Sequence, residues 1–213
     1  PGADVDENTR IANTTTIQKA IDSVGQKGGG TVLMPAGHYC VTVLVRDGWT
    51  ACLHIGYDNI TFKGAGIDKT VIQTRSNYTV NNGEVERGHG IRLDGTTNAN
   101  NPRKNIKLCD FELYGGLNGY TGNFDWPANT STGDGWDITH KGIVLTHNDY
   151  IDQVIIENVY VHDYRGEVVY GGGHGLKKLF IKNSKIANSN ADLLSLAGDM
   201  ICERSEEHTS ELQ

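Results

Sequence analysis

Acidic residues that could serve as an acid and a base recur at regular spacing in this sequence. Glu167 and Asp192 lie 25 residues apart, and each directly precedes an apolar stretch. If Val168 and Leu193 face inward, the two carboxylates face outward on neighbouring coils, about 5 Å apart at the backbone. Like charges at that separation raise the pKa of one group, which suits a general acid beside a base. The spacing therefore predicts Glu167 and Asp192 as a catalytic pair assisted by Asp163, with a solvated surface row as the alternative.

Basic residues in the same part of the chain suit a different reaction, the removal of a carbon-bound proton beside a carboxylate. A lyase acting on a uronate needs a cation to neutralise the carboxylate, and it commonly uses Arg or Lys as the base. Arg165 is the candidate base, and we expect Arg92 and Lys141 on or near the same face. The structural alternative is an ion pair of Arg165 with Glu167 or Asp163.

Metal-binding patterns are weak in this sequence. Calcium could assist a lyase through Asp134, Asp137 or Asp163, but no compact calcium-loop spacing is present. Three histidines lack the short spacing of a zinc site: His140, His147 and His162. We therefore expect no cofactor, with calcium as the exception if the protein is a lyase.

A long aromatic segment interrupts the otherwise short turns between Tyr114 and Ile143. It contains Tyr120, Trp126 and Trp136, and aromatic faces of this kind stack on sugar rings. Long loops within a compact fold are usually functional, although such a loop can also pack its own aromatic residues as a lid. We expect these three side chains to bind substrate, with His162, Arg92 and Lys141 contributing polar contacts.

The elements that position these residues repeat every 25 residues. Apolar triplets begin at Ile143, Val168 and Leu193, and two further sets of triplets step by the same interval: Val154 with Leu179, and Val159 with Ser184. Three short strands per coil without intervening helices predict an all-β parallel β-helix. A propeller would need four strands per blade and a longer period.

Two further features support the stacked-coil prediction. Asp110, Asn158 and Asn183 occupy one position between the second and third strands, where stacked side chains can hydrogen-bond along the column. Near the N-terminus, Thr15 and Gln18 fit a capping box, and Gly25 can end the helix. The sequence thus predicts a short N-terminal helix that caps the first coil.

Three segments together resemble the pectate-lyase-like right-handed β-helix superfamily, in its rhamnogalacturonase and epimerase-like branch. They are NTTTIQKAID at 13–22, GGGTVLMPAGHY at 28–39 and NITFKGAG at 59–66, and the resemblance covers roughly residues 13–200. It implies a right-handed coil with a substrate groove along the first strand and the turn that enters it. It does not select a reaction, because the group contains hydrolases, lyases, epimerases and phage tailspikes.

Composition limits the remaining possibilities. The chain has 213 residues and a net charge of -7, which argues against nucleic acid as a partner. No apolar run approaches the roughly 20 residues that cross a bilayer, so we expect no membrane segment. Residues 204–213 read RSEEHTSELQ and resemble a translated sequencing adapter, so we expect one domain over 1–203, cut short at its C-terminal end, and a non-native tail.

The leading hypothesis is a secreted or cell-surface enzyme that degrades a polysaccharide, with a glycoside hydrolase of the polygalacturonase kind favoured. One alternative is a uronate lyase or epimerase that uses Arg165. The other is a non-catalytic carbohydrate-binding β-helix such as a tailspike or adhesin shaft. The expected partner in each case is a polysaccharide, and an acidic, pectin-like one suits the basic residues.

Overall fold

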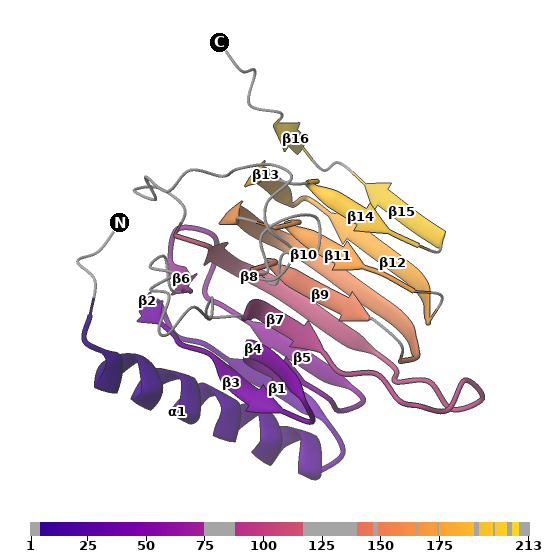
Figure 1. Cartoon of the computed structure of the whole chain (residues 1–213), viewed down its shortest axis with the longest axis horizontal. Coiled ribbons are helices and arrows are strands. Elements are labelled where there is room, and N and C mark those ends of the chain that lie inside the picture. The colour runs from indigo at the N-terminus through magenta and orange to yellow at the C-terminus, as the bar shows by residue number, and fades with distance from the viewer. Residues whose placement is uncertain are drawn as a thin grey trace, which may run out of the picture.

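The chain is a stack of β-strand coils with one helix at its N-terminal end (Figure 1). The computed structural model describes residues 5–74, 88–116, 140–146, 149–164, 166–173, 175–189, 192–197, 199–203 and 206–208. Each complete coil contributes strands to three rows, which we call the first, second and third rows in chain order. Within the described ranges, no helix is both long and apolar enough to span a lipid bilayer.

The first row is a six-stranded sheet in the order β14-β11-β9-β7-β4-β3. Its neighbours pair in parallel, except that β3 is antiparallel to β4. Its strands are β3 (Leu44–Arg46), β4 (Trp49–Ile55), β7 (His89–Leu93), β9 (Ile143–Thr146), β11 (Val169–Gly171) and β14 (Leu194–Leu196).

The second and third rows share a ten-stranded sheet, because β8 and β10 are long enough to bend from one row into the other. The second row holds β1 (Gly30–Leu33), β5 (Ile60–Lys63), β12 (Leu176–Lys182) and β15 (Asp199–Glu203), with the first halves of β8 (Ile106–Tyr114) and β10 (Ile151–Tyr164). The third row holds β2 (Gly37–Cys40), β6 (Thr70–Gln73), β13 (Lys185–Ser189) and β16 (Glu206–His208), with the second halves of β8 and β10.

The strand registers confirm the 25-residue repeat in the second and third rows and at one of the two predicted steps in the first row. Val154 pairs with Leu179 and Val161 with Ile186, each a step of 25 residues. In the first row the expected alignment is wrong by one residue at one step, because Ile143 pairs with Val169 and not with Val168. The reason is local: a register irregularity between Tyr170 and Gly171 absorbs one residue.

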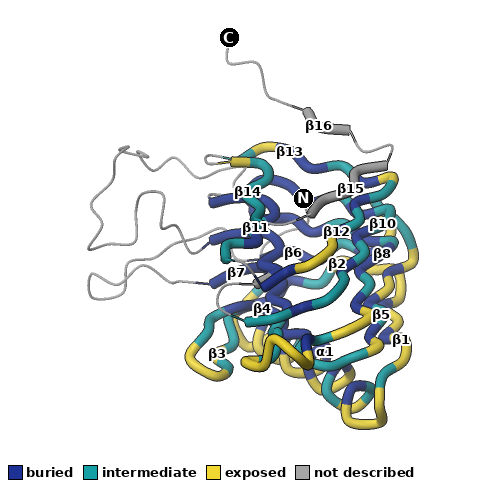
Figure 2. Tube along the Cα trace, turned by 90° about the vertical axis from the view of Figure 1, so that its right-hand side faces the viewer, coloured by how far each residue is buried: buried dark blue, intermediate teal, exposed yellow. Residues whose placement is uncertain are grey.

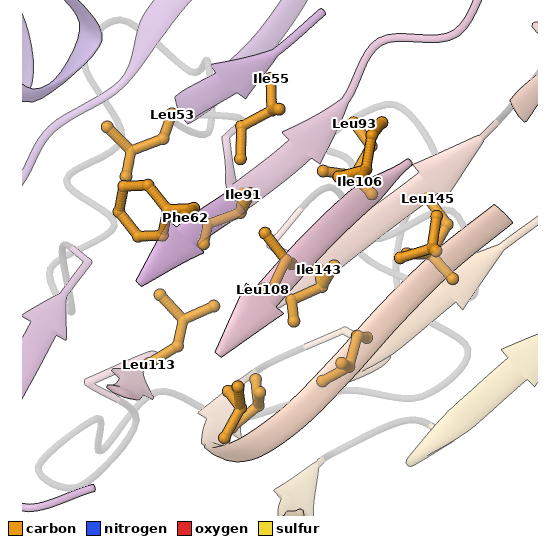
Figure 3. Packing of buried hydrophobic residues seen from close by; sticks show 14 of the residues in the cluster. Leu53, Ile55, Phe62, Ile91, Leu93, Ile106, Leu108, Leu113, Ile143 and Leu145 are labelled. Atoms are coloured by element: carbon orange, nitrogen blue, oxygen red, sulfur yellow. The ribbon is translucent and has the colours of Figure 1, made fainter. Parts of the chain in front are cut away.

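Apolar side chains from the three rows fill the interior of the coil. Leu53, Ile91 and Ile143 stack along the first row, and Phe62 and Leu108 face them from the second row (Figure 3). All five are fully buried, and buried positions continue up the stack (Figure 2). Burial of a side chain of this size contributes about 1.5–3 kcal/mol, so the column of apolar residues is the main source of stability.

The helix α1 (Glu7–Gln26) is longer than the sequence predicts, since it starts before Thr15. Asp6 is the N-cap and accepts a hydrogen bond from the Thr9 amide at 2.9 Å. Gln18, which the sequence predicts as part of a capping box, is buried. Its side-chain amide nitrogen donates to His54 O in β4, and its amide oxygen accepts from His54 N. The helix therefore caps the first coil with hydrogen bonds to exposed strand edges as well as with apolar side chains.

Asn and Asp residues occupy the corners between rows. Asp110, Asn158 and Asn183 all have positive φ (62°, 53° and 48°), a conformation that Asn and Asp tolerate better than most residues. The Asn158 amide donates to the Asp110 carboxylate at 2.7 Å, which confirms the predicted ladder for this pair. Asn183 holds the equivalent position on the next coil, because Glu157 pairs with Lys182.

Candidate active site

Three polar residues occupy equivalent positions just before successive strands of the first row. The pairings of Ile91 with Ile143 and of Ile143 with Val169 place His89 beside Lys141 and Lys141 beside Glu167. The Lys141 ammonium donates to the Glu167 carboxylate at 2.5 Å, and each side chain is only 9% exposed.

The same Lys141 ammonium lies 4.2 Å from the centroid of the Tyr170 ring, on the strand that follows Glu167. A cation at that distance over an aromatic ring is attracted by the ring's negative face. The arrangement therefore holds an ammonium, a carboxylate and a phenol together at the edge of the first row.

Arg92 lies three residues after His89 in β7 and is almost completely buried. Its guanidinium bonds Asp94 at 2.9 Å and lies within 3.5 Å of Asp149, while the Trp49 ring covers it at 4.0 Å. Its Nη1 atom has no hydrogen-bond partner among the described residues. The Arg92 guanidinium is thus fixed in place, and its Nη1 donor is available to a ligand.

His89 has an unusual environment for a histidine. Burial, followed by the charges of Lys141 and Arg92, lowers the pKa of its imidazole to about 3. The ring is therefore neutral at neutral pH, and its Nδ1 atom is buried with no partner in the described part of the chain. An unsatisfied buried polar group costs about 1–3 kcal/mol, so two of them on one strand point to a ligand that bonds them.

The structure places the two predicted acids in unlike surroundings. Glu167 is buried against Lys141, whereas Asp192 is exposed one coil further on. The inward–outward alternation along the first row also differs from the prediction. Strict alternation from Ile143 would turn Gly142 outward, but a β-carbon at Gly142 would lie 2.8 Å from Cγ1 of Val161, so this position faces inward. The catalytic roles of Glu167 and Asp192 stay predictions.

His162 and Asp163 belong to the third row and not to this cluster. His162 Nδ1 lies 2.7 Å from Asp163, and Nε2 lies 3.1 Å from Glu112. Burial opposes charge on the imidazole, but the hydrogen bonds to the two carboxylates outweigh it and raise the pKa of His162. The ring is also stacked between Tyr114 and Tyr160 at centroid distances of 5.1 and 4.0 Å.

The remaining predicted site residues lie outside the described ranges. These are the candidate base Arg165, the substrate-binding residues Tyr120, Trp126 and Trp136, and the calcium candidates Asp134 and Asp137. Among residues that are described, no three His, Cys, Asp or Glu side chains gather as metal ligands would.

Sequence reasoning placed Arg92, Lys141 and Glu167 near one face but missed His89, Tyr170 and Trp49. A usable signal existed for His89, because it precedes Ile91 by the same offset that separates Lys141 from Ile143. Trp49 carries no such signal, since it lies before the regular repeat begins.

Comparison with known proteins shows which family the chain belongs to. The family model for rhamnogalacturonase A/epimerase, pectate lyase-like proteins matches residues 2–193. Mannuronan C5-epimerase AlgE1 of Azotobacter vinelandii is 30% identical in an alignment 174 residues long, and the match covers 72% of this chain and 12% of that protein.

Solved structures agree on the fold. The A-modules of mannuronan C-5 epimerases AlgE4 and AlgE6 of A. vinelandii superpose with TM-scores of 0.60 and 0.64 at 23% and 18% identity. They cover 90% and 92% of this chain, which spans 46% and 52% of them. Pectin methylesterase PemA of Erwinia chrysanthemi gives a TM-score of 0.57 at 13% identity, over 92% of this chain and 52% of that one. The chain thus spans about half of these structures and an eighth of the curated relative, and it belongs to the rhamnogalacturonase A/epimerase, pectate lyase-like family.

Proposed function

We propose that the protein acts on a uronate-containing polysaccharide and that its reaction is epimerisation at C5 of the uronate. The observation that carries this proposal is a pair of buried nitrogen atoms on β7, Nη1 of Arg92 and Nδ1 of His89, beside the ammonium of Lys141. Neither atom has a hydrogen-bond partner among the residues that the structure describes. The polysaccharide is the expected partner from the sequence, and the relatives support an acidic one.

The first requirement of such a reaction is a site for the sugar carboxylate. Arg92 Nη1 offers a donor for a carboxylate oxygen, and Asp94 and Trp49 already hold the rest of the guanidinium. Lys141 adds a second positive charge nearby. Neutralising the carboxylate makes the adjacent C5–H bond more acidic, since the electron pair left by the proton delocalises into the carboxyl group.

The second requirement is a pair of proton-handling groups. In our proposal His89 takes the C5 proton, and the resulting carbanion is reprotonated from the opposite face by the Tyr170 hydroxyl. Burial lowers the pKa of His89 most, and repulsion from Lys141 and Arg92 lowers it further. The arriving carboxylate counters the repulsion, so binding raises the pKa of the imidazole and makes it a better base. The glycosidic bonds stay intact, and solvent restores the two protonation states.

The contacts of Glu167 favour epimerisation over the hydrolase expected from the sequence. Hydrolysis needs one carboxylic acid to protonate the glycosidic oxygen and a second carboxylate to assist. Glu167 already accepts the bond from Lys141, while Asp192 stands exposed on the following coil. A lyase would share the first proton transfer but then expel the 4-linked sugar, so it is the second candidate. Calcium and an extracellular location stay predictions.

Deuterium exchange tests the proposal. The protein is incubated in D₂O with polymannuronate or with polygalacturonate, each with added calcium or a chelator, and the products are examined by NMR and by chain length. Deuterium at C5 with inverted configuration and unchanged chain length is the expected result. Unsaturated, ultraviolet-absorbing ends would indicate a lyase, and new reducing ends without exchange would indicate a hydrolase. Binding with none of these products would indicate a carbohydrate-binding shaft.

A further inference from the structure

One buried tyrosine lies where the third row turns into the first. Tyr164 ends β10 and is fully buried. Its hydroxyl accepts a hydrogen bond from Thr74 at 3.4 Å, and its ring lies 4.8 Å from the ring of His140. Thr74 also lies 3.4 Å from His140 Nε2. Thr74 follows β6, His140 precedes β9 and Tyr164 ends β10, and the three meet at the same corner.

Three glycines surround the Tyr164 ring. A β-carbon at Gly90 would lie 2.6 Å from the hydroxyl oxygen, one at Gly115 would lie 2.8 Å from Cγ, and one at Gly142 would lie 3.2 Å from Cδ2. Real β-carbons essentially never approach closer than 3.0 Å, so the ring occupies space that only glycine leaves open at the first two positions. A β-carbon at each position would also meet a backbone oxygen, at 2.6, 2.3 and 2.4 Å for Gly90, Gly115 and Gly142, so the glycines also allow successive coils to approach closely. The ring therefore packs directly against these backbone segments.

Two of these glycines directly follow candidate site residues. Gly90 comes after His89, and Gly142 comes after Lys141. Hydrogen bonds join the same segments, since Gly90 N donates to Lys141 O at 2.8 Å and Gly142 N donates to Glu167 O at 3.1 Å. A shift of the Tyr164 ring would thus move the backbone that carries both side chains.

We propose that Tyr164, fixed by Thr74 and His140, is the positioning residue that sets the separation of His89 and Lys141. The predicted effect on kcat rests on the proposed function, whereas the predicted effect on the positions of His89 and Lys141 does not. Burial raises the pKa of the Tyr164 hydroxyl well above its usual value, so the hydroxyl stays protonated throughout the working range. His140 is neutral for the same reason, because burial lowers its pKa to about 3. The anchor is therefore uncharged and rigid at any pH at which the enzyme would work.

The test uses mild variants that keep the core filled. Tyr164→Phe and Thr74→Val each delete the hydroxyl–hydroxyl contact, whereas Thr74→Ser keeps it. Tyr39→Phe is the matched control, because it removes a hydroxyl that bonds Pro35 at 3.1 Å. We expect kcat to fall about 10-fold in Tyr164→Phe and in Thr74→Val with little change in KM, since sub-ångström misplacement is costly in catalysis. Tyr164→Phe removes the contact with Thr74, and Thr74→Val removes the same contact together with those to Tyr114 O and His140. The double variant should therefore be no slower than Thr74→Val alone.

A second readout does not depend on turnover. The pH dependence of Lys141 acylation, measured by mass spectrometry with Lys107 as internal reference, reports the surroundings of its ammonium. We expect Tyr164→Phe and Thr74→Val to change this profile, and Thr74→Ser and Tyr39→Phe to preserve it. Altered labelling without activity on any uronate polymer would overturn the proposed function and leave the positioning role standing. Unchanged labelling and unchanged kcat in folded variants would overturn the positioning role.

Discussion

The first and third rows each carry a histidine among charged groups, but the two are held in opposite ways. His162 in the third row has both ring nitrogens within bonding distance of carboxylates, Asp163 and Glu112, and its pKa is raised. His89 in the first row has cations nearby and a pKa lowered to about 3, and its Nδ1 has no partner within the described ranges. In the third-row cluster both ring nitrogens of His162 have partners, whereas in the first-row cluster Nδ1 of His89 and Nη1 of Arg92 have none among the described residues.

That difference separates a structural role from a binding role. A buried polar network that is fully bonded stiffens a fold, and a partly bonded one leaves a cost that a ligand can remove. Both rows hold the residue types that suggest chemistry in a sequence. Only the count of satisfied donors and acceptors distinguishes them, and it favours the first row as the place where substrate binds.

The largest expected effect on turnover comes from breaking the buried one of two Lys–Glu pairs that link successive coils. Lys141–Glu167 is 9% exposed on each side, and Lys107–Glu157 in the second row is 36% and 35% exposed. Lys141→Met should lower kcat by about 10³-fold, because it removes the charge that stabilises the carbanion. Glu167→Gln, which keeps the size of the side chain, should lower kcat by about 10²-fold, because it removes the carboxylate that holds the Lys141 ammonium in place.

Lys107→Met is the matched control for this prediction. An exposed pair contributes little, so this variant should keep normal turnover and nearly normal stability. If Lys107→Met and Lys141→Met reduced kcat equally, the contrast between the pairs would have no functional meaning.

A smaller effect is expected from Arg92→Lys. The ammonium cannot reproduce the stacked, forked contacts with Trp49 and Asp94, so substrate affinity should fall about 10- to 100-fold with a lesser change in kcat. Arg46→Lys is a close control, since Arg46 bonds Asp22 at 2.8 Å and lies 5.8 Å from the Tyr57 ring. Steady-state kinetics on both variants would contradict the assignment if KM rose equally in the two.

The corner ladder should affect stability and not activity. Asn158→Leu should lower the free energy of unfolding by about 1–3 kcal/mol, because it removes the bond to Asp110 and places a branched residue at φ 53°. Asn158→Gly should cost less, since glycine accepts positive φ without strain. Denaturant unfolding measures both, and equal losses would show that backbone strain plays no part.

The smallest effect concerns pH. The raised pKa of His162 means that its bonds to Asp163 and Glu112 stabilise the fold fully below about pH 6.5, and this stability is lost as pH rises through the folded-state pKa. The lowered pKa values of His89 and His140 act oppositely, so stability falls as pH drops from about 6.5 towards 3.

Each of these groups contributes a slope of at most about 1.4 kcal/mol per pH unit. His162→Gln should therefore flatten only the alkaline side of a plot of unfolding free energy against pH. A change confined to the acidic side would reverse our assignment of the two histidines.

The sequence predicts the fold well because its repeat is an arithmetic property. A constant step of 25 residues, as between Val154 and Leu179, determines which residues stack. The apolar residues among them are the ones that face inward. The helix starts earlier than predicted because Asp6, and not Thr15, is its N-cap. The buried role of Gln18 could not be predicted locally, because it depends on a strand 36 residues away.

The candidate site is less predictable for a similar reason. Lys141, Arg92 and Glu167 were expected near one face, but whether Glu167 is a free acid depends on a one-residue register at Val169. Nothing in the local sequence marks Tyr164, since its role comes from glycines on three other segments of the chain.

The most direct test of the contrast between the rows is an NMR titration of His89 and His162 with and without a trimannuronate or trigalacturonate ligand. A ligand whose carboxyls have been reduced to alcohols serves as the control. If the first row binds a carboxylate, saturation with the acidic ligand should raise the pKa of His89 and leave His162 unchanged, and the reduced ligand should do neither. A shift of His162 instead, or an unchanged His89 with ligand bound, would contradict the account.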